Sequence, residues 1–194
     1  AVTLSVANEA ASLPVAYRLY LPKEWAEDAA RRKKAGVPLD IRFKTKPEIA
    51  LEQIRWACEA GLPRGVALMD AAYGTDSRLR TGMTALGVSY VAGIQPKILV
   101  WPPGTGPRRK GKPLNNTGRR DEPDLISAKR LALDLPKHAW RAIRWREGSA
   151  GWLSSRFARV HVRVGHSQLM PELLSQEWLL IEWPEGEAAP TKYW

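Results

Sequence analysis

Apolar and polar positions alternate with a period of two at the start of the chain, and this pattern predicts two β-strands. The first covers residues 2–6 and the second residues 13–21. Asn8-Glu9-Ala10 lies between them as a turn, so the two strands are expected to pair antiparallel. Pro22 ends the second strand because proline cannot donate a ladder hydrogen bond.

After residue 46 the spacing of apolar residues changes to that of an α-helix. A helix is predicted from Pro47 to Ala60, with proline in its first turn and Gly61 after its end. A short apolar run at Val66–Met69 then predicts a strand buried on both faces. A second helix over 76–86 and a strand over 88–94 complete a β-β-α-β-α-β order, which predicts an α/β fold: a mixed sheet covered by helices.

Asp70 directly follows the apolar run at Val66–Met69. Open α/β sheets place ligand chemistry at the carboxyl ends of their strands, so this carboxylate is a candidate metal ligand or acid/base. The alternative is that Asp70 only caps the turn or helix that follows it. Residue type and position leave both interpretations open.

The second half of the chain has a different character. Residues 101–120 are rich in glycine and proline and predict a loop. A short helix is expected over 127–133, and strands over 140–146, 153–164 and 177–183, with one more beginning at Tyr193-Trp194. Towards the end of 153–164, Arg159, His161 and Arg163 alternate with Ala158, Val160, Val162 and Val164, so one face is apolar and the other cationic.

The positive charge is concentrated in that half. The chain carries a formal net charge of +10, and residues 97–163 hold 16 basic and 5 acidic side chains. Such asymmetry favours a polyanionic partner. A ribosomal or RNA-binding protein would show the same bias, so the charge alone does not choose between DNA and RNA. The candidate DNA-binding residues are Arg108, Arg109, Lys110, Lys112, Arg119, Arg120, Trp152, Arg156, Arg159 and Arg163.

Each of these candidates has a structural alternative. Basic loop residues can simply be solvated, and most tryptophans of a small β unit belong to its core. Trp152 is the tryptophan most expected at a surface, because Gly148, Gly151 and Ser154 surround it and suggest a hairpin tip. The basic run at 31–34 is expected to be a solvated face rather than a DNA contact.

Composition excludes several classes of protein. The 194 residues suggest one domain, or one domain with a large insertion, and contain no run of 18 apolar residues that would predict a membrane span. No signal peptide is visible, and the single Cys58 cannot form an internal disulfide and is expected in the core. We therefore expect a cytoplasmic protein without a membrane partner.

Several stretches resemble the DDE-type transposases of bacterial insertion sequences. They are Ser5-Val6-Ala7-Asn8-Glu9-Ala10, residues 14–22, Phe43-Lys44-Thr45-Lys46-Pro47, Met69-Asp70-Ala71-Ala72-Tyr73-Gly74, residues 179–184 and Thr191-Lys192-Tyr193-Trp194. The chain is most similar to the 701-type group, which is related to the insertion-sequence-four lineage. The resemblance implies an RNase H-like mixed sheet with a β-rich basic insertion.

The resemblance also implies a chemistry and a partner. In that family three carboxylates hold two divalent ions, Mg²⁺ or Mn²⁺, which activate a water and then a 3′-hydroxyl for attack on DNA. Asp70 matches the middle carboxylate and is thus the implied catalytic and metal-binding residue. The full-length protein is expected to bind transposon ends and target DNA, and to act as a homodimer.

The sequence departs from the complete family pattern. No acidic residue precedes Glu9, and no helix with a glutamate follows the last predicted strand, so two of the three carboxylates are missing. We therefore expect an interior fragment, inactive alone: residues 1–96 as a partial RNase H-like core without its first strand, 97–176 as the basic insertion, and 177–194 as the return toward the core.

Two other functions compete with that of a transposase. A non-catalytic nucleic-acid-binding module would use the same basic insertion, and so stays open as an alternative. A small hydrolase or nucleotide-binding domain is disfavoured, because the sequence has neither a glycine-rich phosphate loop nor Gly-x-Ser-x-Gly.

Overall fold

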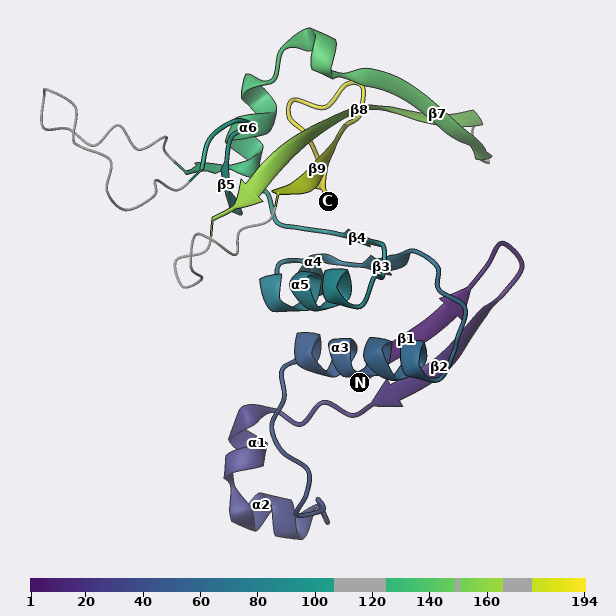
Figure 1. The fold of residues 1–194 in the computed structure, drawn as a ribbon, viewed down its shortest axis with the longest axis vertical. Helices are drawn as coiled ribbons and strands as arrows, with labels where there is room; N and C mark the ends of the chain where they lie inside the picture. Colours follow the sequence, from purple (N-terminus) through teal and green to yellow (C-terminus); the bar gives the residue numbers. More distant parts are fainter. Residues whose placement is uncertain (107–124, 149–150, 166–175) are drawn as a thin grey trace, which may run out of the picture. The chain divides into compact units, whose positions relative to one another are not determined.

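The computed structural model describes residues 1–106, 125–148, 151–165 and 176–194, and within them the chain forms two compact units. Unit 1 covers Ala1–Ala92 and unit 2 covers Gly93–Trp194 (Figure 1). Helices and sheets occur in both units, which confirms the α/β content expected from the sequence.

Unit 1 begins with the expected antiparallel hairpin. Strand β1 (Val2–Ala7) pairs with β2 (Ser12–Arg18), and the register shifts once, between Leu4 and Ser5. The Asn8 side-chain oxygen accepts from the N–H groups of Ala10 and Ala11, both at 2.9 Å, and so fixes the turn.

Two short helices, α1 (Lys23–Glu27) and α2 (Ala29–Lys34), occupy the basic stretch that follows. The expectation of a uniformly solvated basic run is wrong for Arg32. Its guanidinium donates to the carbonyls of Ala26, Pro38 and Ile41, at 3.3, 2.8 and 2.9 Å. Arg32 therefore ties the loop to the two helices, while Arg31 pairs with Asp28.

Helix α3 (Lys46–Glu59) starts at a complete capping box. The Thr45 hydroxyl accepts from the Glu48 N–H, and the Glu48 carboxylate accepts from the Thr45 N–H at 2.7 Å. Ile49 is buried as predicted, whereas Cys58 is only half-buried. Gln53, which the apolar pattern did not mark, is buried because its amide donates to the Val2 carbonyl at 3.2 Å.

A second pair of strands completes unit 1. Strand β3 (Ala67–Met69) pairs in parallel with β4 (Tyr90–Ala92), and α4 (Ala71–Gly74) and α5 (Ser77–Ala85) connect them. Among the described residues β1–β2 and β3–β4 are separate sheets rather than one mixed sheet. The prediction that Val66–Met69 is buried on both faces is wrong: Leu68 is 78 % exposed and lines an open cavity.

Unit 2 is built on one antiparallel sheet, in the strand order β10-β9-β8-β5-β6, with β7 also paired to β8. The strands are β5 (Leu99–Trp101), β6 (Ile126–Ser127), β7 (Arg141–Gly148), β8 (Gly151–Val164), β9 (Gln176–Trp183) and β10 (Lys192–Tyr193). Strand β5 was not expected, because the sequence around it is rich in proline.

One face of this sheet packs on helix α6 (Ala128–Asp134) (Figure 1). Val162 of β8 and Leu179 and Ile181 of β9 form the core with Ala128 and Leu131 of the helix. The prediction that β8 has one apolar face is confirmed, since Ala158 and Val162 are buried and Arg159 and His161 are exposed. Over the described residues no helix is long and apolar enough to cross a bilayer.

Candidate catalytic edge and nucleic-acid interface

Asp70 lies exposed at the carboxyl end of β3, where the chain turns into α4. One carboxylate oxygen accepts from the Ala72 N–H at 2.9 Å, so Asp70 does cap the next helix. A capping bond occupies one lone pair of a carboxylate that has about four, so capping leaves the second oxygen open to a ligand. Both interpretations of this residue from the sequence are therefore compatible.

A cavity of about 460 Å³ opens beside Asp70 within unit 1. Its walls come from β1, α3 and β3, and Asp70 and Tyr73 stand at its rim. Burial, followed by the negative charge of Asp70, raises the pKa of the Tyr73 hydroxyl. The hydroxyl therefore remains a hydrogen-bond donor at neutral pH, next to the position where a ligand of Asp70 would bind.

The cavity separates two strand edges. Among the described residues β1 pairs only with β2, and β3 only with β4, so each strand has one edge without a ladder partner. A second cavity, of about 180 Å³, continues along β1 past Ala57 and Cys58 of α3. The two cavities together follow the gap between the two small sheets.

Asp70 is the one acidic residue that this edge provides, and no group of three or more His, Cys, Asp or Glu suited to a metal occurs in the described parts of the chain. Mg²⁺ requires near-octahedral oxygen ligation, and a two-ion centre needs several carboxylates. The described residues do not by themselves fit such a centre.

The predicted DNA-binding residues of β8 fall on two opposite faces. Arg159 and Arg163 lie on the cationic face, and the Arg163 guanidinium donates to the Thr105 carbonyl at 2.9 Å. Arg156 lies three residues before Arg159, and side chains alternate along a strand, so Arg156 lies on the opposite face. Its guanidinium carbon is 5.0 Å from the centre of the Trp183 ring. Arg156 therefore does not share the cationic face with Arg159 and Arg163.

Trp152 stands at the tip of the β7–β8 hairpin, as its neighbouring glycines predicted. Gly148 pairs with Gly151, whose φ of 118° suits glycine, and Trp152 is 55 % exposed. The Arg144 guanidinium lies 5.5 Å from the Trp152 ring. The remaining candidates, Arg108, Arg109, Lys110, Lys112, Arg119 and Arg120, lie outside the described residues.

Comparison with known protein families gives a match over most of the chain. Residues 1–151 match the family model described as DDE superfamily endonuclease, which is more than half of the chain. The chain belongs to the DDE superfamily endonucleases. Neither a curated protein nor a solved structure matches it.

Membership of the DDE superfamily gives the site a general chemistry. Endonucleases of this superfamily are transposase-type nucleases that act on DNA and typically use divalent metal ions. In this DDE endonuclease domain the matched residues include β3, Asp70 and the β7 strand of the basic segment. The specific assignments of catalytic and DNA-binding residues are proposals, taken up below.

Sequence reasoning missed two residues that the structure singles out. Tyr73 shares the cavity rim with Asp70, and its signal was its spacing of three residues from the aspartate. Trp178 of β9 is 56 % exposed and pairs in register with His161. No local pattern distinguishes Trp178 from a core tryptophan, because it lies in an apolar strand.

Proposed function

We propose that this chain forms part of the catalytic core of a DNA transposase of the 701-type group, related to the insertion-sequence-four lineage. The observation that carries the proposal is Asp70, an exposed carboxylate at the carboxyl end of a parallel strand in a chain of the DDE superfamily. The reaction would be cleavage of a DNA strand followed by strand transfer, with Asp70 as the middle of three carboxylates.

The metal requirement follows from this assignment. The cofactor would be Mg²⁺ or Mn²⁺, which in this superfamily supplies Lewis-acid activation of the nucleophile and of the scissile phosphate. Asp70 would contribute one carboxylate oxygen, and Tyr73 a neighbouring hydroxyl donor. The other acidic ligands are not among the described residues, so the chain is proposed to be inactive on its own.

The gap between β1 and β3 supports the proposal that the RNase H-like core lacks one strand here. An extended segment in the 460 Å³ cavity would pair with both free edges and join the two small sheets into one. It would also cover exposed apolar side chains such as Leu68. An acidic residue on that segment would come to the same rim as Asp70.

DNA would be held by the basic segment. We propose residues 97–176 as a DNA-binding insertion in a core formed by 1–96 and rejoined by 177–194. Its contacts would come from the loop cations together with Arg159 and Arg163 on one face and Trp152 and Arg156 on the other. In the full-length protein a homodimer would bring two transposon ends together, and the protein would act in the nucleoid.

A strand-cleavage assay tests the proposal. We expect the 194-residue chain to show no cleavage of supercoiled DNA with Mg²⁺ or Mn²⁺. We expect a longer protein that adds the missing strand and acids to cleave, and Asp70→Asn to abolish that cleavage. Robust turnover by the 194-residue chain that Asp70→Asn abolishes would contradict the missing-ligand proposal.

The second candidate is a nucleic-acid-binding module without catalysis. The observation in its favour is that the described residues contain no cluster of metal ligands. Asp70→Ala should leave DNA affinity nearly unchanged under both functions. Transposition by a full-length protein that survives Asp70→Asn would favour the binding module.

A further inference from the structure

The face of the unit 2 sheet opposite α6 carries an exposed tryptophan among cations. We define the outer face as Arg159, His161 and Arg163 of β8 with Trp178 and Leu180 of β9. Directly opposed residues of antiparallel strands share a face, and the register pairs His161 with Trp178 and Arg159 with Leu180. Because Val162 and Leu179 are buried against α6, the outer face is the other side of the sheet.

Trp178 is held in place although it is exposed. Its ring centroid lies 3.5 Å from that of His161, with an angle of 38° between the planes. The Arg159 guanidinium carbon lies 4.9 Å from the same indole. These contacts restrain a side chain that is still 56 % exposed, so little conformational entropy remains to be lost when a ligand stacks on it.

The charge around Trp178 is suited to a phosphate backbone. Arg159 and Arg163 flank His161 along β8, two residues apart on either side, which spaces positive charges along the strand. The acidic residue on the same face, Glu182, is buried and paired with Lys192 at 3.1 Å. Cations that alternate with an exposed aromatic ring are typical of surfaces that bind single strands.

We propose that the outer face binds unpaired DNA, with Trp178 stacking on a base and Arg159 and Arg163 contacting the adjoining phosphates. An indole can reach the face of a base only when that base is unstacked from its neighbours, so duplex DNA does not offer this contact. The ligand is therefore a single-stranded segment exposed during strand cleavage or transfer. The inference rests on the proposed function in taking DNA as the ligand.

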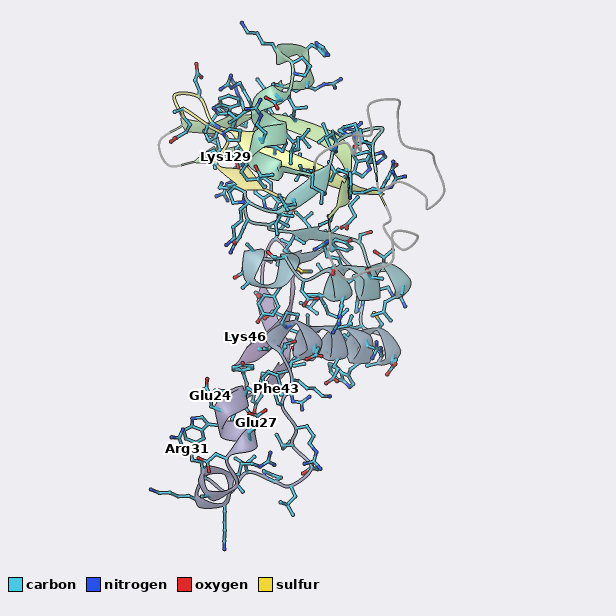
Figure 2. All side chains as sticks on the ribbon, turned by 90° about the vertical axis from the view of Figure 1, so that its left-hand side faces the viewer. Glu24, Glu27, Arg31, Phe43, Lys46 and Lys129 are labelled. Atoms are coloured by element: carbon cyan, nitrogen blue, oxygen red, sulfur yellow. The ribbon has the colours of Figure 1, made fainter. Side chains whose placement is uncertain are left out.

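Trp25 provides a matched control on unit 1. It is 41 % exposed, and the Arg31 guanidinium lies 5.8 Å from its ring, so it is likewise an exposed tryptophan beside an arginine. Glu24, Glu27 and Arg31 lie close together on α1 and α2 (Figure 2). Trp25 lies on a five-residue helix, whereas the Trp178 ring lies against His161 on a strand with arginines spaced along it, so we expect Trp25 not to stack on a base.

The experiment measures binding of the 194-residue chain to an oligothymidylate of about 15 nucleotides and to a duplex of the same length, by fluorescence anisotropy. A second probe replaces one thymine with 2-aminopurine, whose emission falls when it stacks on an aromatic ring. We expect Trp178→Ala to weaken oligothymidylate binding about tenfold or more and to abolish the 2-aminopurine response. Trp178→Phe should stay within about threefold of the unsubstituted chain, because it keeps a ring.

Trp25→Ala should change neither probe, and duplex binding should change less than about twofold in Trp178→Ala. Equal losses in the two tryptophan variants, equal losses for single strand and duplex, or an unsubstituted chain without a 2-aminopurine response would overturn the inference. The test needs no metal and no cleavage. Absence of cleavage by the longer protein, with stacking retained in the 194-residue chain, would count against the proposed function alone. Absent stacking in the 194-residue chain, with cleavage by the longer protein intact, would count against the outer face alone.

Discussion

Asp70 combines a structural and a chemical role within one carboxylate. Its bond to the Ala72 N–H starts α4, and its exposure at the strand end makes it available to a ligand. The two roles respond differently to substitution, because an amide oxygen can cap a helix but cannot carry the charge that a divalent ion requires.

The comparison of Asp70→Asn with Asp70→Ala separates these roles. Asparagine should keep the free energy of unfolding within a few tenths of a kcal/mol, and alanine should lower it by about 1 kcal/mol through loss of the cap. Urea denaturation measures both values. A large destabilisation by asparagine would show that the carboxylate is mainly structural and would remove the basis for using Asp70→Asn as a catalytic test.

At the scale of the element, α3 depends on its first turn. The backbone N–H of Thr45, and then its hydroxyl, donate to the Glu48 carboxylate and lower the pKa of Glu48 below its ordinary value of 4.5. The helix in turn supports the β1–β2 sheet through the buried Gln53 amide. The capping box is thus linked to the wall of the cavity beside Asp70.

The capping box makes the free energy of unfolding of unit 1 fall as the pH is lowered. The pKa of Glu48 is lower in the folded chain than its ordinary value of 4.5. The ionised Glu48 therefore contributes its full stabilisation above pH 4.5, and this stabilisation is lost as the pH falls through the pKa of the folded state. Glu48→Gln should lower the free energy of unfolding by about 0.5 kcal/mol at pH 7. The difference from the unsubstituted chain should shrink in denaturation curves below pH 4.5, whereas a constant difference would contradict the assignment.

At the scale of the whole molecule, charge is divided unequally along the chain. Residues 97–163 carry 16 of the 30 basic side chains but only 5 of the 20 acidic ones. The basic run of α2 lies in unit 1, where Arg32 is bound to backbone carbonyls and Arg31 to Asp28. DNA affinity should therefore depend on the basic segment far more than on α2.

The salt dependence of duplex binding tests whether DNA affinity depends on the basic segment rather than on α2. The logarithm of affinity should fall linearly with the logarithm of salt concentration, by about 0.9 per phosphate contacted. Substituting Arg119 and Arg120 with glutamine should reduce that slope by about 1.8, whereas the matched pair Lys33→Gln and Lys34→Gln should leave it unchanged. A flat response of the unsubstituted chain would mean that the basic segment is only solvated.

Local sequence was sufficient to predict most of the helices and strands. Helix α3 follows from its capping residues and apolar stripe, the β1–β2 hairpin from alternation and a turn, and the two faces of β8 from parity. The same reasoning placed Asp70 at a strand end and Trp152 at a hairpin tip. These features depend on residues a few positions apart, so the sequence by itself determined them.

Tertiary structure decided what depends on distant partners. The exposure of Leu68, the cavity lined by β1 and β3, and the three carbonyl bonds of Arg32 depend on how separate segments of the chain pack. The pairing of Trp178 with His161 likewise required the β8–β9 register. Burial and pairing are properties of the packed chain, and no periodicity within one segment encodes which other segment will cover it.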